Sequence, residues 1–271
     1  MSPWQKLLEH PHSGGHFVQL YAADDSALIN NAGRYLWEGL RRGEGVFVVA
    51  TAEHQESFSR HLSGLGADVQ ESIANGQLVF LDAHQVLAGF MTAGQPDWIQ
   101  FEKVVRGAMR RLRPREGVED SRAYGEMVGI LWKLRRFAAA IRLEQLWNKL
   151  MEQSRFSLYC AYAIDIFGQE FAPSNLDGVL GEHTHLIPAE WDGKLEAALN
   201  RSMDEVLGAE ASGLRMRIKA QSDPSWAVMP AAESIILWLQ RFLPAQADDI
   251  RKRAREYYQQ ALERCAVAEN R

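Results

Sequence analysis

Cysteine is scarce in this chain, with only Cys160 and Cys265 among 271 residues. The two lie far apart in the sequence, and Cys160 falls within an apolar run, so a buried free thiol is favoured over a disulfide. Long apolar runs are missing as well, because none approaches the roughly 18 residues that a membrane-spanning helix requires. The segment Met1–His12 is amphipathic and has no signal-peptide core. We therefore expect a protein of the reducing cytoplasm with no membrane partner.

The chain also has no excess of positive charge. Lys and Arg total 30 against 35 Asp and Glu, which gives a formal net charge of −5, whereas a general nucleic-acid-binding domain usually has a pI above about 9. Two basic runs, Arg110–Arg115 and Arg251–Arg255, each border a predicted helix, and acidic residues flank the second run. A solvated helix face accounts for both runs, so the sequence argues against nucleic acid as a partner.

Glycine and lysine are missing where a nucleotide-binding α/β protein carries its phosphate loop. The first predicted strand-turn-helix unit, residues 16–26, reads HFVQLYAADDS. A phosphate loop needs glycines, so that backbone N–H groups can wrap the phosphate, then a Lys and a Ser or Thr. Asp24 and Asp25 would instead repel a polyphosphate at a helix end that otherwise attracts anions. This absence favours sensing or scaffolding over hydrolysis, and we expect neither an enzyme nor a bound cofactor.

Short β-rich runs alternate with helical stretches over the first two thirds of the chain. This alternation predicts βαβ units and therefore an α/β fold, with a mainly parallel sheet and helices on both faces. The predicted strands are residues 17–21, 46–51, 78–81, 122–125 and 156–164. The first predicted helix begins at an N-cap Ser26 and ends before Gly43. Further helices are predicted over residues 55–65, 97–112, 126–137 and 139–153, and a loop over 92–96.

The pattern changes beyond Pro173. Residues 182–188 are predicted to form a short irregular link, and helices are predicted over 194–207, 231–243 and 246–267. Residues 214–219 remain ambiguous between strand and helix. The last helix carries one apolar stripe, which either packs on the body of the protein or mediates self-association or partner docking. The stripe consists of Ile250, Ala254, Tyr257, Ala261 and Cys265.

Several segments resemble one family when they are taken in order. They are Tyr124–Val128, Leu131–Trp132, Arg142–Asn148 and Phe156–Tyr162, and the residues from His16 through Tyr21 and from Gly39 to Gly45 also look like the opening of that family. Together they resemble the MEDS family, the methanogen/methylotroph sensory domains first associated with a regulator of dichloromethane metabolism. The resemblance covers roughly residues 14–190. It implies a RecA/KaiC-like fold without a working phosphate loop, and a sensory, ligand-binding role in bacterial or archaeal signalling.

The resemblance also implies a domain division and a set of partners. It predicts a sensory domain over residues 14–190 and a helical C-terminal extension over 191–271. Members of the family are often joined to histidine kinases, response regulators or DNA-binding modules, so the expected partners are a small-molecule ligand and such a signalling protein, with a homo-oligomer as a further expectation. This chain shows neither kinase nucleotide-binding boxes nor a helix-turn-helix, which leaves the output of the signal open.

Glu126 is the first candidate for ligand binding. It follows a predicted strand and opens a helix, at the carboxyl end of the sheet where open α/β folds bind ligands. Its carboxylate could accept a hydrogen bond from a ligand, or simply benefit from the helix dipole. Tyr21, Trp132, Tyr159 and Tyr162 lie near predicted element ends. They would line an aromatic cavity if the ligand is a small apolar or halogenated molecule, and core packing is the alternative for each.

Glu144 and Asn148 are four residues apart and share one face of a predicted helix. They could line a pocket or bond the backbone of a neighbouring element, and Arg122 or Arg142 is a candidate ion-pair partner for Glu126 or Glu144. The predicted ligand-binding set is therefore Tyr21, Glu126, Trp132, Glu144, Asn148 and Tyr162.

One segment has residue types that ligate metals: Glu182, His183, His185 and Glu190. A His-x-His sequence places two imidazoles on one side of an extended segment, and zinc accepts His and carboxylate ligands. A second cluster with a recognisable spacing is missing, so we predict no metal site and keep His183 and His185 only as weak candidates. A hydrogen-bonded histidine that anchors the link is the simpler interpretation, and His16 is expected to be structural.

These observations predict a non-catalytic cytoplasmic sensory protein that relays ligand binding through its helical C-terminal region or its oligomeric state. Two alternatives stay open. One is an ATP-binding or ATP-hydrolysing RecA-like switch with a degenerate phosphate loop, in which Glu126 would be catalytic. The other is a transcriptional regulator that contacts DNA through residues 246–271.

Overall fold

The computed structural model describes residues 3–188, 193–220 and 227–269. Its centre is a six-stranded sheet in the order β3-β2-β6-β7-β1-β8, in which every neighbouring pair is parallel. The α/β fold with a parallel sheet is therefore confirmed. The strands are β1 (His16–Leu20), β2 (Gly45–Ala50), β3 (Leu78–Asp82), β6 (Ser121–Gly125), β7 (Phe156–Tyr162) and β8 (His185–Ile187).

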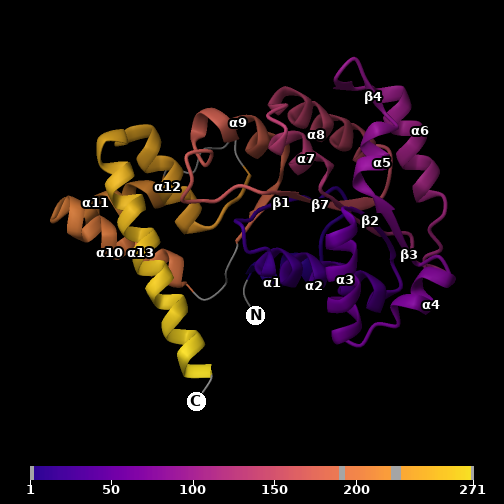
Figure 1. Ribbon diagram of the computed structural model, residues 1–271, viewed down its shortest axis with the longest axis horizontal. Helices are drawn as coiled ribbons and strands as arrows, with labels where there is room; N and C mark the ends of the chain where they lie inside the picture. The colour runs from indigo at the N-terminus through magenta and orange to yellow at the C-terminus, as the bar shows by residue number, and fades with distance from the viewer. Residues whose placement is uncertain (1–2, 189–192, 221–226, 270–271) are drawn as a thin grey trace.

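Helices cover both faces of this sheet (Figure 1). One face carries α1 (Pro3–Glu9), α2 (Ser26–Arg42), α3 (Ala52–Gly64) and α4 (Val69–Ala74). The other carries α5 (Ala83–Ala88), α6 (Trp98–Met109), α7 (Met127–Lys133), α8 (Phe137–Met151) and α9 (Pro173–Glu182).

Alternation along the strands builds the two cores between these layers. Val46 and Val48 belong to the core under α2 and α3, whereas Phe47 and Val49 belong to the core on the opposite face. Successive side chains of a strand point to opposite faces of the sheet, so an apolar run such as Gly45–Ala50 fills both cores at once. All six residues of this strand are buried, as expected for a strand inside a parallel sheet.

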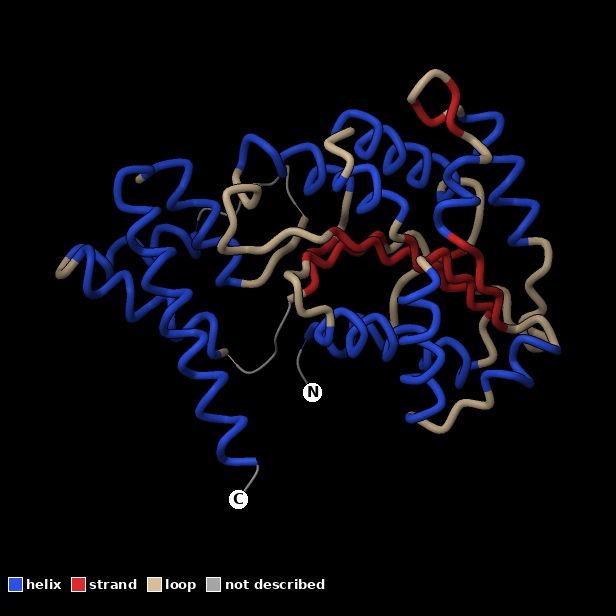
Figure 2. The backbone as a smooth tube through the Cα atoms, viewed as in Figure 1, coloured by secondary structure: helices blue, strands red, loops and turns tan. Residues whose placement is uncertain are grey.

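Four helices follow the sheet and lie together beyond β8 (Figures 1 and 2). They are α10 (Lys194–Leu207), α11 (Glu210–Ala220), α12 (Ala231–Phe242) and α13 (Pro244–Glu269). The predicted apolar stripe of α13 packs inward at Ile250 and Ala254, which are fully buried, while the Tyr257 hydroxyl donates to Glu205 Oε2 over 2.6 Å. The side chain of Cys265 lies outside the described residues. In the described part of the chain, every helix is too short or too polar to traverse a lipid bilayer.

The structure corrects three details of the predicted secondary structure. Residues 185–187 form the edge strand β8 within the predicted irregular link, because they pair with β1 from Phe17 to Gln19, and so short a strand leaves no periodic signal. The predicted loop 92–96 contains a hairpin, β4 (Met91–Thr92) and β5 (Gln95–Pro96). The N-cap of α2 is Asp25 and not Ser26. The ambiguous residues 214–219 are helical.

Candidate functional site

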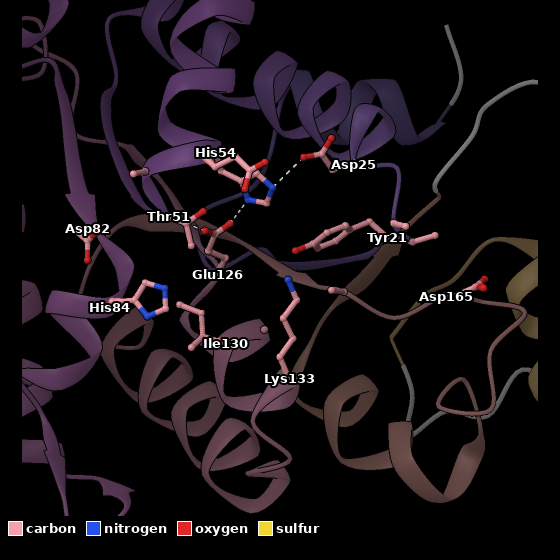
Figure 3. A pocket seen from close by; sticks show the side chains of 16 residues that line it. Tyr21, Asp25, Thr51, His54, Asp82, His84, Glu126, Ile130, Lys133 and Asp165 are labelled. Carbon is pink, nitrogen blue, oxygen red and sulfur yellow. Dashed lines mark hydrogen bonds and ion pairs between the residues drawn. The ribbon is translucent and has the colours of Figure 1, made fainter.

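A cleft opens at the carboxyl edge of the sheet between β2 and β6. The chain leaves β2 into α3 on one face and leaves β6 into α7 on the other, and in open α/β folds such a divergence creates the crevice in which ligands bind. The cleft has a volume of about 740 Å³, within the usual range for small-molecule sites. Residues that follow β1, β2, β3, β6 and β7 line it, together with one side of α7 (Figure 3).

Glu126 lies at the centre of this cleft and is 3% exposed. It is the first residue after β6, and its backbone N–H donates to Val49 O over 3.2 Å, which fixes it against the end of β2. Its carboxylate accepts hydrogen bonds from the Thr51 backbone N–H and from His54 Nδ1. The Tyr124 hydroxyl donates to Oε2 over 3.1 Å. Three donors from three elements therefore hold one carboxylate at the floor of the cleft.

His54 joins Glu126 to a second carboxylate. Its Nε2 lies 3.1 Å from Asp25 Oδ2, on the turn after β1. Burial by itself lowers the pKa of His54, but the hydrogen bonds and charges of Glu126 and Asp25 outweigh burial and raise it above its ordinary value. For Glu126, burial raises the pKa, and the hydrogen bond and charge of His54 with the Thr51 N–H lower it further than burial raises it. Both ring nitrogens face carboxylates and can both donate only when His54 is protonated, and the raised pKa favours that charged form.

The turn between β1 and α2 uses its own carboxylates where a phosphate loop would bind an anion. Asp24 Oδ1 accepts the Ser26 backbone N–H over 2.9 Å at the start of α2. Asp25 faces His54, as described above. A carboxylate therefore takes one of the N–H donors that a phosphate would need at this helix end, and a second carboxylate lies next to it.

The lining of the cleft is mainly acidic. Among the described lining residues, the carboxylates belong to Asp25, Glu53, Asp82, Glu126 and Asp165, and they face one lysine, Lys133. Lys133 Nζ lies 6.0 Å from the centre of the Tyr21 ring. Burial, followed by the charges of Glu126 and Asp25, raises the pKa of Tyr21, so this side chain stays a neutral hydroxyl. The field favours a cationic ligand or a neutral hydrogen-bond donor.

Two of the six predicted ligand-binding residues, Tyr21 and Glu126, line this cleft. Trp132 lies in the core, where its Nε1 donates to Glu170 Oε2 over 3.4 Å and its ring packs against Phe137 and Tyr162. Among the described lining residues, Tyr21 is the aromatic one. The other predicted aromatic residues, Trp132, Tyr159 and Tyr162, do not line the cleft, because their side chains are buried between sheet and helices.

The other three predicted residues, Glu144, Asn148 and Tyr162, gather in a second, closed place. The Tyr162 hydroxyl donates to Glu144 Oε1 over 2.7 Å, and Asn148 Nδ2 donates to the Glu182 backbone oxygen over 3.0 Å. Their neighbours are His16, Cys160 and His183, and Glu144 and Cys160 are 0% exposed. The sequence correctly places Glu144 and Asn148 on one helix face, and the structure directs that face into the core rather than toward the cleft.

Arg122 pairs with neither Glu126 nor Glu144, contrary to expectation. It is fully buried, and its guanidinium donates to the Glu44 carboxylate over 2.5 and 3.1 Å. It also donates to the backbone oxygens of Leu8 and Tyr35. Arg122 therefore ties α1 and α2 to the sheet at the edge opposite the cleft.

The two histidines of the His-x-His segment do not share one side. The His183 ring lies 4.0 Å from the His16 ring, whereas the His185 ring lies 5.8 Å from the Phe17 ring. His16 and Phe17 are consecutive residues of β1 and point to opposite faces. The sequence-based expectation is wrong because His183 ends α9 before the strand begins. Glu190 lies outside the described residues.

Sequence reasoning placed neither His54 nor Asp25 in the ligand-binding set, and it treated Asp25 only as a barrier to phosphate. The sequence could have identified His54, because it lies in the first turn of a helix that follows a buried strand. Glu126 was identified from the same kind of position, at the carboxyl end of a strand. Asp165, after β7, obeys a similar rule. Which of these side chains face one another is decided by the order of strands in the sheet.

A comparison with protein-family models matches residues 15–184 to the MEthanogen/methylotroph, DcmR Sensory domain (MEDS). A comparison with curated proteins gives no significant match.

Proposed function

This chain belongs to the MEDS family of sensory domains, and we propose that it is a non-catalytic sensory protein that binds a small molecule in the acidic cleft. The observation that carries the proposal is the chain of contacts Asp25–His54–Glu126 at the floor of the cleft. These contacts hold the Asp25 and Glu126 carboxylates in fixed orientations in the lining of the cleft, which has a volume of about 740 Å³ at the carboxyl edge of the sheet. This is the position at which open α/β folds bind ligands.

The ligand that suits this cleft is a small organic cation or a neutral donor of hydrogen bonds. Five lining carboxylates exceed the positive charge of Lys133 and His54, so an anion would enter against the field. The apolar surface of Tyr21 and Ile130 offers a place for a short hydrocarbon part beside the carboxylates. Polyphosphates suit it poorly, because Asp24 already accepts the N–H at the start of α2.

The contacts of His54 support a binding role over catalysis. A general base needs a ring nitrogen free to take a proton from the substrate. Both nitrogens of His54 are held by carboxylates, and its pKa is raised. Protein contacts occupy three of the roughly four acceptor sites of the Glu126 carboxylate. They hold it in place as an acceptor for a ligand rather than leaving it free to activate water.

A relay toward the C-terminal helices is part of the proposal. Asp165 lines the cleft, and its Oδ2 accepts a hydrogen bond from Arg255 Nη2 of α13 over 2.9 Å. Beside it an apolar groove of about 290 Å³ lies between residues 164–167 and the α13 side chains Tyr258 and Leu262. A ligand that contacts Asp165 competes with Arg255. It therefore favours one arrangement of α13 over another, which is the condition for a population shift.

Calorimetric titration and thermal shift of the purified chain test the proposal. The panel contains methylammonium and trimethylammonium ions, small alcohols and amides, a chlorinated hydrocarbon, and MgATP. We expect a cation or a neutral donor to raise the melting temperature by mass action. We expect Glu126→Gln to weaken that ligand at least about 10-fold, through loss of a charge-assisted hydrogen bond.

The matched control is Glu56→Gln, because Glu56 lies on the same helix as His54 but is exposed and outside the cleft. It should leave binding unchanged. Stabilisation by MgATP alone would overturn the non-catalytic sensor in favour of a nucleotide switch. Stabilisation by the chlorinated hydrocarbon alone would retain a sensor and refute the cationic ligand class.

A further inference from the structure

A closed cluster of four metal-ligating side chains lies on the far side of β1 and β7 from α2. It consists of His16 on β1, Cys160 on β7, Glu144 on α8 and His183 at the end of α9. One ligand atom from each residue lies within 4.8 Å of the other three. All four side chains are buried, and none of them lines the cleft around Glu126.

Three of the distances within the cluster match those of a tetrahedral zinc site. His16 Nε2 lies 3.4 Å from Cys160 Sγ and 3.3 Å from Glu144 Oε2. Cys160 Sγ lies 3.4 Å from the same Oε2. Zinc bonds of about 2.0–2.1 Å to nitrogen and oxygen and about 2.3 Å to sulfur, at tetrahedral angles, place the ligand atoms about 3.3–3.6 Å apart. These three atoms therefore already form one face of the tetrahedron. The fourth ligand, His183 Nε2, lies 3.3 Å from the other carboxylate oxygen, Oε1.

Outer hydrogen bonds direct both histidines toward the cluster. His183 Nδ1 lies 2.7 Å from Val179 O, a backbone oxygen that can only accept, so Nδ1 carries the proton. His16 Nδ1 lies 2.8 Å from Asn148 Oδ1. Asn148 uses its NH₂ group to donate to Glu182 over 3.0 and 2.9 Å, so its oxygen faces His16. In neutral imidazoles both Nε2 lone pairs then point at the centre. Metal-binding histidines usually donate their other ring N–H to an oxygen in this way.

Without a cation the cluster holds more acceptors than donors. Two Nε2 lone pairs face the Glu144 carboxylate, and within the described residues the donors directed at it are the Tyr162 hydroxyl and the Cys160 thiol. His183 Nε2 lies 3.3 Å from Glu144 Oε1 but forms no hydrogen bond within the described residues, although its side chain is 0% exposed. A buried polar atom without a partner is costly and calls for an explanation. A divalent ion supplies one, because it accepts all four lone pairs at once.

We propose that His16, Glu144, Cys160 and His183 bind one zinc ion in a closed, structural site. The donor set of two imidazoles, one carboxylate and one thiolate is typical of zinc. On binding, the Cys160 thiol loses its proton to solvent and a sulfur–zinc bond forms, with no change of oxidation state. Carboxylate and thiolate balance the charge of the ion, so the buried site is neutral. Four protein ligands leave no position for a substrate.

Such an ion would fix the junction between the sheet and the C-terminal helices. His183 caps the C-terminus of α9, and one residue separates it from β8. Leu186 N–H of that strand donates to Val228 O over 2.8 Å, just before α12. Through His183 the metal would hold this connection to β1 and β7. The proposed zinc site is independent of the ligand proposed for the cleft.

Metal analysis of the full chain, purified without a histidine tag, tests the proposal. We expect about one zinc per chain by mass spectrometry and zinc rebinding after chelation. We expect cobalt substitution to give the visible absorption of a tetrahedral ion with a thiolate charge-transfer band. Cys160→Ser should abolish the charge-transfer band. Asn148→Ala, which removes an outer hydrogen bond, should weaken zinc roughly 10–100-fold, and His183→Gln should weaken it more.

His185→Gln is the matched control, because His185 belongs to the same His-x-His segment but packs on the other face of the sheet. It should leave zinc affinity unchanged. If the buried variants fail to fold, X-ray absorption of the wild-type protein decides, since it should show one sulfur among four ligands. A folded wild-type protein that neither retains zinc nor gives a tetrahedral cobalt spectrum overturns the proposal. Equal losses for His183→Gln and His185→Gln also overturn it.

Discussion

Two glutamates of this protein, Glu126 and Glu144, are each bound by histidine and each nearly or fully buried. Glu126 lies at the carboxyl edge of the sheet, and its three partners are all donors. Glu144 lies in the middle of α8 against β1 and β7, and two of its partners are the Nε2 atoms of His16 and His183, each 3.3 Å from its carboxylate. Around Glu126, the same residue types form an ion pair whose hydrogen bonds come from the protein, beside an open cleft. Around Glu144, they form a closed cluster with more acceptors than donors.

This difference shows that access and the balance of donors decide what a cluster can do. In the cleft, the protein satisfies its own carboxylate and leaves the neighbouring volume to a visiting molecule. In the closed cluster, all four side chains are buried, and the proposed ion would satisfy their acceptors. Four predictions break or sharpen this comparison.

The largest expected effect is on stability in the closed cluster. With chelator present, so that metal plays no part, Glu144→Ala should lower the free energy of unfolding by about 3 kcal/mol, because the buried Tyr162 hydroxyl and Cys160 thiol lose their acceptor and the truncation leaves a cavity. Glu126→Ala should lower it by only about 1–2 kcal/mol, because water can enter the cleft and replace the carboxylate. Urea unfolding measures both values. Equal losses of unfolding free energy for the two variants would show that water reaches both sites equally well.

The second prediction concerns the accessibility of Cys160. It is 0% exposed, and burial, followed by the charge of Glu144, raises the pKa of its thiol. In a Cys265→Ser background with chelator, we expect a disulfide reagent to label Cys160 at least about 100-fold more slowly in the native state than in urea, since labelling then requires an opening that costs about 3 kcal/mol or more.

The reference for this measurement is Ala23→Cys, made in a chain without Cys160 and Cys265. Ala23 lines the cleft and is exposed, so its thiol should react at nearly the same rate with and without urea. Comparable native rates for Cys160 and Ala23→Cys would mean that the cluster is as open as the cleft.

A third prediction is the pH dependence of the pair in the cleft. The pKa of His54 is raised above its ordinary 6.5, so its contribution to stability is complete below pH 6.5 and is lost as the pH rises through the raised pKa. The pKa of Glu126 is lowered from 4.5, so its contribution is complete above pH 4.5 and is lost as the pH falls through the lowered pKa. The destabilisation by His54→Gln should therefore be greatest between pH 4.5 and 6.5.

Urea unfolding of wild type and His54→Gln from pH 4 to pH 9 measures this window, and NMR titration of His54 gives its pKa directly. His84→Gln, in the lining of the same cleft, is the control for a change of histidine count. A loss that grows steadily above pH 7 would contradict the charged pair.

The smallest expected effect is on the connection from the cleft to α13. Asp165→Asn removes an ion pair whose Arg255 side chain is 50% exposed, so stability should change by only about 0.5 kcal/mol. Hydrogen exchange should nevertheless show whether binding of a ligand in the cleft changes the protection of α13 in wild type and no longer does so in the variant. Identical responses would assign the relay to another contact.

The parts of the fold that sequence reasoning reproduced have strong local signals. The buried strand β2 is a continuous apolar run, Gly43 ends α2 with a φ of 80°, and α10 coincides with its predicted bounds. The strand β8 was missed because three residues are too few to show an alternation of apolar and polar side chains. They form a strand only by pairing with β1. Glu126 was identified as a ligand-binding candidate because the carboxyl edge of a parallel sheet can be inferred from strand order along the chain.

The second cluster shows where such inference stops. Glu144 and Asn148 were paired from helix geometry, and Cys160 was correctly expected as a free, buried thiol. His16 and Cys160 are 144 residues apart, and only the pairing of β1 with β7, with Val18 opposite Cys160, brings them together. Helix periodicity relates residues within a few turns and contains no information about such distances.

The sequence by itself determined the family, the alternation of strands and helices, and the absence of a phosphate-binding turn, because these depend on residues close to one another in the chain. Tertiary structure alone decided that His54 joins Asp25 to Glu126, and that two histidines, a glutamate and a cysteine meet in a closed space. The reason is physical: the lateral order and register of parallel strands are fixed by burial of both faces of the sheet at once, a property of the whole molecule.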